Sequence, residues 1–176
     1  MFFSKKLLIF IFIYNRIIMK WYKVVNCGKE VSQMLLGEYR HNVDVKGRVS
    51  VPSKFRGDLG QTFVITKGLD NCLFMYSKQE WETFELKLKE LPLTNQDARS
   101  FVRFFFAGAA ECEVDKQGRI NIPQNLREYA NIQKDVVIVG VATRAEIWDS
   151  ENWNKYTSSD SLDGTKLASQ MSQLGI

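Results

Sequence analysis

The sequence predicts an α+β protein, mainly β, in which two copies of one small unit pack as a pseudo-symmetric barrel with short helices outside. Three observations support this class. The nine residues DVKGRVSVP at 44–52 return as DKQGRINIP at 115–123. Apolar residues alternate on both sides of each glycine, which is the pattern of strands with one buried face. Each copy is too small to bury a full core alone, so we expect the two to share one.

The similarity between the copies extends well beyond the nine-residue motif. An offset of 71 aligns Gly47 with Gly118, and after one inserted residue an offset of 72 aligns Trp81 with Trp153. About 45 residues per copy are related in this way. We expect the first copy at residues 34–83, a connecting helical segment at 84–108, the second copy at 109–157 and a C-terminal tail at 158–176.

Within each copy the expected elements follow in the same order. A strand leads into the aspartate, and a tight turn follows at Lys46–Gly47 or Gln117–Gly118, because glycine can take the positive φ that a short turn demands. A second strand ends at a proline, which also suits the start of a helix. The remaining expected elements are a short helix, two strands and a longer helix, at 53–59, 62–68, 71–77 and 78–91 in the first copy and at 124–130, 135–141, 144–150 and 150–158 in the second.

Between the copies, residues 93–110 predict a helix that is capped by Thr94 or Asn95. Its Phe101, Phe104 and Phe105 are expected to pack in the core, and an oligomer interface is the second interpretation. The tail begins as a polar linker, and residues 165–176 suggest a short amphipathic helix.

The first 33 residues differ in composition from the rest. Two lysines precede an apolar run from Leu7 to Tyr14, as at the start of a signal peptide, but no small-residue cleavage site follows. The run is also far shorter than the roughly 20 apolar residues that a spanning helix needs. Codons for residues 30–32 can spell a bacterial ribosome-binding sequence just upstream of Met34. We therefore expect the protein to start at Met34, with residues 1–33 as a non-native extension, and we expect no membrane partner.

Charge and residue counts argue against several classes of protein. The net charge of +4 comes from the first 33 residues, because the rest of the chain holds 18 basic and 19 acidic side chains. Bulk charge therefore does not indicate a polyanion partner. The three dispersed cysteines form no CxxC pair, and His41 is the single histidine. Neither a zinc site, a disulfide framework nor a catalytic triad is indicated, so we expect no enzyme activity, no cofactor and no metal.

The repeated Asp-x-x-Gly-Arg pattern has two interpretations. In the simpler one, Asp44 pairs with Arg48 and Asp115 with Arg119, and the pairs only staple two turns. In the other, the arginines read DNA, because a two-stranded ribbon fits the major groove and arginine pairs bidentately with guanine O6 and N7.

Basic residues cluster around the first motif. Between residues 40 and 56 the basic side chains exceed the acidic ones by four. With one residue of the second motif, they form the set of expected DNA contacts: Arg40, Lys46, Arg48, Lys54, Arg56 and Arg119. The second motif has Gln117 in place of Lys46, which suggests a less basic hairpin and unequal contributions from the two copies.

These motifs resemble the MraZ family. The resemblance runs from Met34 to about Tyr156 and is carried by GEYRHNVDVKGRVSVP, by RFFFAGAAECEVDKQGRINIP and by the segments that reach Trp81 and Trp153. The family belongs to a wider AbrB/SpoVT-type group of DNA-binding proteins. The resemblance therefore implies a duplicated swapped-hairpin or double-split β-barrel.

The resemblance also implies a function. Members are bacterial transcriptional regulators that bind G-rich direct repeats upstream of the division and cell-wall gene cluster, including their own promoter. They assemble into rings of eight or more subunits, so a cytoplasmic, nucleoid-associated homo-oligomer on double-stranded DNA is expected. Lys46, Arg48 and Arg119 would face the DNA, and Asp44, Gly47, Asp115 and Gly118 would build and orient the motif.

An enzyme that uses Asp44 and Asp115 as paired carboxylates has no other support in the sequence. Two further alternatives stay open. An AbrB-like antitoxin or transition-state regulator usually carries one motif per chain, so two motifs argue against it. An oligomeric scaffold without a nucleic-acid role would keep the turns as structural staples. Salt-sensitive, sequence-dependent DNA binding separates a regulator from a scaffold.

Overall fold

A computed structural model describes residues 34–158 and 164–172 of the 176-residue chain. The chain divides into two units, residues 1–33 and residues 34–176, and every described residue belongs to the second. The hypotheses about the first 33 residues and about parts of the tail therefore lie outside the described residues. No helix within the described ranges is long and apolar enough to cross a membrane.

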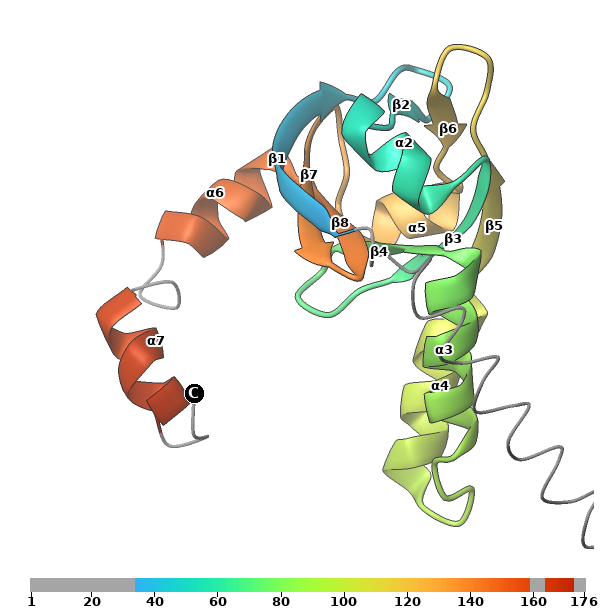
Figure 1. The fold of residues 1–176 in the computed structure, drawn as a ribbon, viewed down its shortest axis with the longest axis vertical. Helices are drawn as coiled ribbons and strands as arrows, with labels where there is room; N and C mark the ends of the chain where they lie inside the picture. Colours follow the sequence, from blue (N-terminus) through green and yellow to red (C-terminus); the bar gives the residue numbers. More distant parts are fainter. Residues whose placement is uncertain (1–33, 159–163, 173–176) are drawn as a thin grey trace, which may run out of the picture. The chain divides into compact units, whose positions relative to one another are not determined.

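The fold is mixed α/β, and both copies use the same order of elements (Figure 1). The first copy comprises β1 (Leu35–Asn42), β2 (Arg48–Ser50), α2 (Ser53–Leu59), β3 (Thr62–Lys67), β4 (Leu73–Ser77) and α3 (Lys78–Lys89). After α4 (Gln96–Gly108), the second copy comprises β5 (Ala110–Glu113), β6 (Arg119–Asn121), α5 (Gln124–Tyr129), β7 (Asp135–Ala142), β8 (Arg144–Asp149) and α6 (Ser150–Ser158). The tail contains α7 (Gly164–Met171). The expected ranges of α2 and α6 are confirmed residue for residue.

The strands of the two copies are exchanged. The main sheet is antiparallel, in the order β1-β7-β8-β4-β3-β5, so that β1 pairs with β7 and β5 pairs with β3. β2 and β6 pair with each other in a separate two-stranded ladder, here called the crossed ribbon. The two strands of each motif are therefore not paired to each other as a simple hairpin. Only the turn closes locally, and the ladder partners come from the other copy.

The main sheet is not closed. Among the described residues β1 and β5 form its two edges, and no ladder joins them. The mainly antiparallel sheet with short helices agrees with the expected class, whereas the barrel stays a prediction.

Alternation of side chains buries one face of the crossed ribbon. The inward residues are at most 1% exposed and are Val49, Val51, Ile120 and Ile122. They pack with Phe55 of α2 and Leu126 of α5 in the core cluster that includes one face of the main sheet. Because this face is fixed in the core, the other face of the crossed ribbon points outward.

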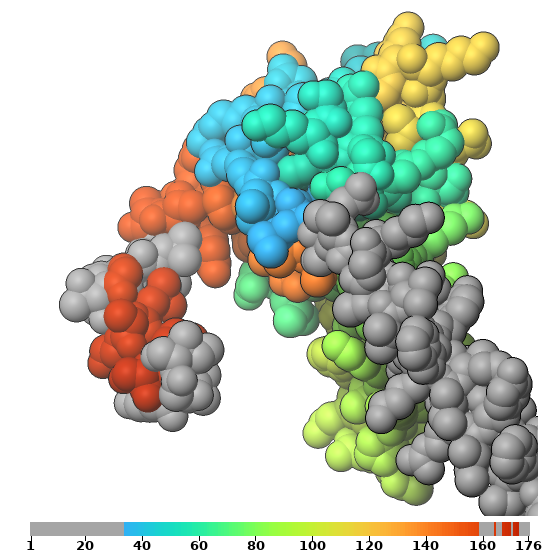
Figure 2. All heavy atoms as spheres, viewed as in Figure 1, coloured from blue at the N-terminus to red at the C-terminus, as the bar shows by residue number. Residues whose placement is uncertain are grey.

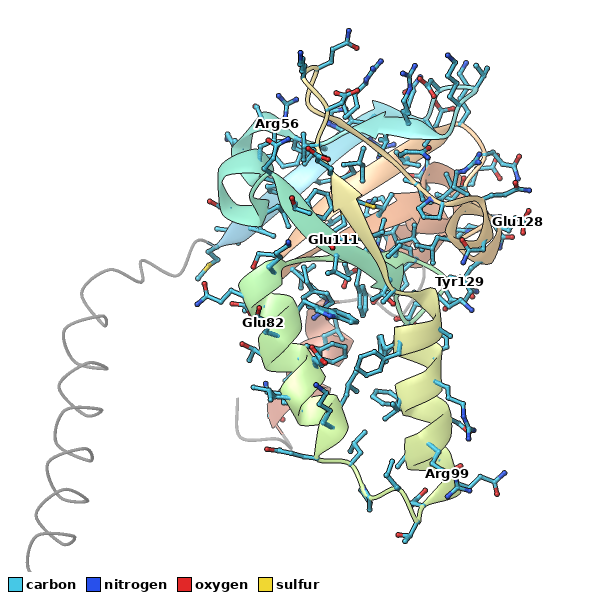
Figure 3. All side chains as sticks on the ribbon, turned by 90° about the vertical axis from the view of Figure 1, so that its right-hand side faces the viewer. Arg56, Glu82, Arg99, Glu111, Glu128 and Tyr129 are labelled. Carbon is cyan, nitrogen blue, oxygen red and sulfur yellow. The ribbon has the colours of Figure 1, made fainter. Side chains whose placement is uncertain are left out.

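The helices α3 and α4 lie side by side next to the main sheet (Figures 1 and 3). The Asn95 side-chain oxygen accepts backbone N–H bonds from Asp97 at 2.7 Å and Ala98 at 3.1 Å, so Asn95 rather than Thr94 caps α4. Phe105 is buried, as predicted, and Phe104 is partly buried. Phe101 is 43% exposed, so its predicted place in the core is wrong.

Candidate nucleic-acid interface

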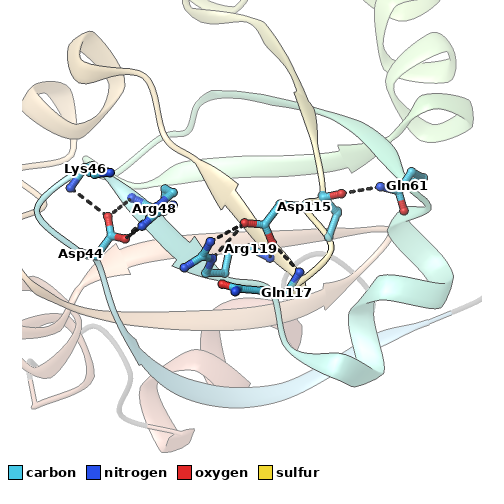
Figure 4. A network of polar contacts seen from close by, with 8 residues as sticks. Asp44, Lys46, Arg48, Gln61, Asp115, Gln117 and Arg119 are labelled. Atoms are coloured by element: carbon cyan, nitrogen blue, oxygen red, sulfur yellow. Dashed lines mark hydrogen bonds and ion pairs between the residues drawn. The ribbon is translucent and has the colours of Figure 1, made fainter.

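The first motif folds as a tight turn around the Asp44 carboxylate (Figure 4). One carboxylate oxygen accepts the backbone N–H groups of Lys46 and Arg48, both at 2.9 Å. The other oxygen accepts a hydrogen bond from Arg48 Nε at 2.8 Å and forms an ion pair with Nη2 at 2.6 Å. The Gly47 N–H donates to the Asp44 carbonyl at 2.8 Å and closes the turn. One aspartate thus builds the turn and fixes its arginine.

The second motif repeats this geometry. The Asp115 carboxylate accepts the N–H groups of Gln117 at 2.8 Å and Arg119 at 2.9 Å. Its other oxygen accepts from Arg119 Nε at 2.9 Å and from Nη2 at 2.7 Å. The predicted Asp–Arg pairs are present in both copies. Each aspartate also accepts two backbone N–H groups of its turn.

Hydrogen bonds from Arg48 lower the pKa of Asp44 from 3.8 to about 2, and those from Arg119 lower the pKa of Asp115. Both carboxylates are therefore ionised at neutral pH. Each arginine directs Nε and Nη2 at its aspartate and has five N–H donors in all. The remaining edge, formed by Nη1 and Nη2, makes no hydrogen bond to another described residue, so it is available for a bidentate contact. The Asp–Arg pairs thus orient the guanidinium groups and leave some of their N–H donors free to bind a partner.

The register of the crossed ribbon places both arginines on its outward face. Arg48 lies opposite Asn121, and Ser50 lies opposite Arg119. Their side chains point away from the buried Val49 and Ile120. Diagonal neighbours of this kind lie about 7–8 Å apart on one face. The two arginines therefore form one short outward row, contributed equally by the two copies.

Each glycine of the motif lies against an arginine of the other copy. Gly47 has a φ of +81° and Gly118 a φ of +77°, which glycine tolerates best. A Cβ on Gly118 would collide with the guanidinium of Arg56, and one on Gly47 would press on that of Arg127. Both arginines also donate Nε to a carbonyl in their own copy, Arg56 to Val51 at 2.9 Å and Arg127 to Ile122 at 3.2 Å. Arg56 therefore supports the opposite turn.

Two other predicted contacts lie away from the turns. The Arg40 guanidinium contacts Ser150 and Asn154 of α6 at 3.4 and 3.3 Å and pairs with Glu38 at 3.3 Å. Lys54 is exposed in the first turn of α2. The structure thus brings Lys46, Arg48, Arg119 and Arg56 together around the crossed ribbon, and it engages Arg40 elsewhere.

The second motif with its flanking strands is less basic than the first, as expected, because Glu111 and Glu113 stand at the positions of Arg40 and Asn42. The turns themselves do not differ in charge. Lys116 is exposed at the position equivalent to Val45, so each turn carries one lysine (Lys46 or Lys116), one arginine and one aspartate. In Figure 2 the second turn, drawn in yellow, protrudes from the surface. Lys116 stands one position before the equivalent of Lys46, so the total charge of the two turns indicates it and the single position of Lys46 does not.

Catalytic and metal chemistry find no support in the described part of the chain. Asp44 and Asp115 are each committed to their own arginine, so they do not act as a carboxylate pair. Cys72 and Cys112 are buried free thiols, and burial raises the pKa of both, to about 11 for Cys112. Burial and the nearby Arg56 lower the pKa of His41. No three His, Cys, Asp or Glu side chains gather into a metal site within residues 34–158 and 164–172.

Comparison with known proteins gives consistent matches. A family model described as "MraZ protein, putative antitoxin-like" matches twice, at residues 34–104 and 105–174. Curated proteins named "Transcriptional regulator MraZ" are 66% identical in Caldicellulosiruptor saccharolyticus, 60% in Alkaliphilus oremlandii and 60% in Acetivibrio thermocellus. Each of these alignments spans 143 residues, which is 81% of this chain and 100% of the relative.

Proposed function

The chain belongs to the MraZ family, and from that premise we propose that it is a DNA-binding transcriptional regulator that reads double-stranded DNA with the outward face of the crossed ribbon. The observation that carries the proposal is the row of two aspartate-oriented arginines on one two-stranded ribbon. A ribbon of this width fits the major groove, and arginine is the commonest reader of guanine there. Fixing each guanidinium before binding reduces the entropy that DNA contact would cost.

The turns supply the backbone contacts of the proposed complex. Lys46, Lys116 and Lys54 are exposed around the crossed ribbon and suit contacts to phosphate oxygens. Arg56 acts as a positioning residue, because its guanidinium lies against Gly118 of the opposite turn. Arg40 lies outside the proposed contact set, since α6 and Glu38 already engage it.

The finer parts of the proposal come from the family resemblance. The DNA sites are G-rich direct repeats upstream of the division and cell-wall gene cluster, including the promoter of its own gene. The protein acts in the cytoplasm, associated with the nucleoid, as a ring of eight or more subunits. A ring places identical ribbons in the same orientation, which suits direct repeats. Several weak contacts on one ring then gain affinity through effective concentration.

Binding to upstream DNA tests this proposal, with Arg48→Ala compared against Arg40→Ala as a matched loss of one positive charge. We expect Arg48→Ala to lose at least about tenfold in affinity for the specific DNA, and more where several subunits bind together. Arg40→Ala should bind as the unmodified chain does. The measurement is a titration of labelled DNA at two salt concentrations, with a scrambled-repeat competitor, and binding should weaken with salt.

Other outcomes separate the alternatives. Normal binding by Arg48→Ala would overturn the assignment of the crossed ribbon as the reading surface. Equal affinity for repeat and scrambled DNA would reduce the function to nonspecific association. An absence of binding at both salt concentrations would leave the two motifs as structural staples and favour an oligomeric scaffold.

A further inference from the structure

The outward face of the crossed ribbon is not the same at its two ends. At one end Arg48 stands beside Asn121, and at the other Arg119 stands beside Ser50. The aspartate, glycine and arginine are identical in the two copies, whereas the neighbour of each arginine differs. Within the β2–β6 ladder, the outward face therefore carries one chemical asymmetry, at positions 50 and 121, in addition to the differences between the two turns.

Backbone hydrogen bonds show how closely these neighbours stand. The Ile122 N–H donates to the Gly47 carbonyl and the Val51 N–H to the Gly118 carbonyl, both at 2.9 Å. Hydrogen-bonded and non-hydrogen-bonded pairs alternate along an antiparallel ladder. The pairs on the outward face are therefore the non-hydrogen-bonded ones, whose side chains come closest, with Cβ atoms about 4.5–5.5 Å apart. Asn121 thus projects directly beside Arg48.

The Asn121 side chain is available for an external partner. It is exposed, and its amide makes no side-chain hydrogen bond with the described residues, although its backbone carbonyl accepts a weak bond from the Cys112 thiol. The buried Ile120 and Ile122 on either side fix the strand from which it projects. The strand is therefore fixed, while the amide makes no hydrogen bond within the described residues.

An asparagine amide pairs bidentately with adenine N6 and N7 in the major groove, whereas serine bonds to several bases without choosing one. Given the proposed DNA binding, on which this inference rests, we propose that Asn121 determines specificity. It reads an adenine next to the guanine that Arg48 reads, and Ser50 makes no equivalent choice beside Arg119. The preferred site then has an adenine requirement at one end only.

This asymmetry gives the DNA site a direction. Two residues along a strand span about 6.6–6.8 Å, which is close to two base-pair steps of about 3.4 Å. The two arginines therefore address bases about two steps apart. With identical neighbours at positions 50 and 121, the base-reading side chains of the ladder would give no preference between the two orientations of such a site. With Asn121 at one end, one orientation is preferred.

The test uses the full chain and duplexes that it selects from a random-sequence pool. Each base pair of the best selected duplex is then replaced singly, and affinities are measured for the unmodified chain and for Asn121→Ala. We expect Asn121→Ala to lose about tenfold to a hundredfold discrimination at one A·T pair beside a G·C pair. Its salt dependence and thermal unfolding should match those of the unmodified chain, because the side chain is exposed.

A double exchange, Ser50→Asn with Asn121→Ser, provides the second test with the composition unchanged. It should move the adenine preference to the other end of the selected site. If the unmodified chain selects no sequence, the proposed function fails and this inference fails with it. If it selects a sequence that depends on Arg48, while Asn121→Ala and the double exchange keep every base preference, only the role of Asn121 is overturned.

Discussion

The two copies of the repeated unit share their turns and differ around them. In both, an aspartate binds two backbone N–H groups and its own arginine with nearly the same distances. The neighbouring positions have diverged: Val45 aligns with Lys116, Ser50 with Asn121 and Arg40 with Glu111. Positions that build the turn are thus the same in the two copies, while positions that only face solvent or a distant helix vary. The shared positions are those that the fold requires, and the diverged positions are those that are free to differ for contact with a partner.

The glycines should show the largest effect among the shared positions. Gly118→Ala forces an L-residue to a φ of +77° and drives Arg56 away from the turn, while Gly47→Ala meets a looser contact with Arg127. We expect Gly118→Ala to lower the free energy of unfolding by about 1–3 kcal/mol, and Gly47→Ala by less. Urea unfolding at neutral pH measures both. Unchanged stability of Gly118→Ala would contradict the tight approach of Arg56.

Acid should weaken both turns. The pKa of Asp44 falls from 3.8 to about 2 on folding, and that of Asp115 falls as well. Their stabilisation is therefore complete above about pH 4 and is lost as the pH falls towards 2. The double variant Asp44→Asn with Asp115→Asn removes both titrations and should show a shallower loss of thermal midpoint over this range. Each single variant should show a similar, smaller part of this effect. If the thermal midpoints of the unmodified chain and the double variant fall in parallel with pH, the two aspartates do not cause the acid sensitivity.

The smallest effect should come from the diverged pair at positions 40 and 111. Arg40 contacts the start of α6, and the equivalent Glu111 pairs with Lys78 at the start of α3 at 2.6 Å. β1 and β5 thus each contact a helix of the other copy, β1 through hydrogen bonds and β5 through an ion pair. The side chains of Glu111 and Lys78 are each 58% exposed, so Arg40→Ala and Glu111→Ala should each change the free energy of unfolding by less than about 1 kcal/mol. If chemical unfolding shows that either variant loses several kcal/mol of unfolding free energy, these contacts are needed for the stability of the fold.

The sequence predicts local structure in this protein well. The bounds of α2 and α6, the cap at Asn95 and the buried Val49 and Ile120 follow from capping and period-2 rules, which depend on near neighbours. The Asp–Arg pairs also follow, because their partners are four residues apart. Arg48 and Arg119 on one face of the ribbon agree with the same alternation.

Contacts between residues far apart in the chain could not be predicted from local sequence patterns. A turn that closes between Asp44 and Arg48 does not determine which strand extends the ladder, so the pairing of β2 with β6 required the whole fold. The contact of Arg40 with α6 joins residues 110 positions apart, and no local pattern indicates it. Phe101 carries the same apolar signal as Phe105, but its position on α4 faces outward.

The exchange of strands also sets the order of events during synthesis. Leu35 of β1 pairs with Ala142 and Asn42 pairs with Asp135, so the first strand waits about 100 residues for its ladder partner. At 5–20 residues per second on the ribosome, that delay lasts roughly 5–20 s. Throughout it, the first copy offers unpaired backbone N–H and C=O groups to any other nascent chain. Until β7 is made, a second nascent chain can supply the same ladder partner, so exchange of strands between chains competes with completion of one chain.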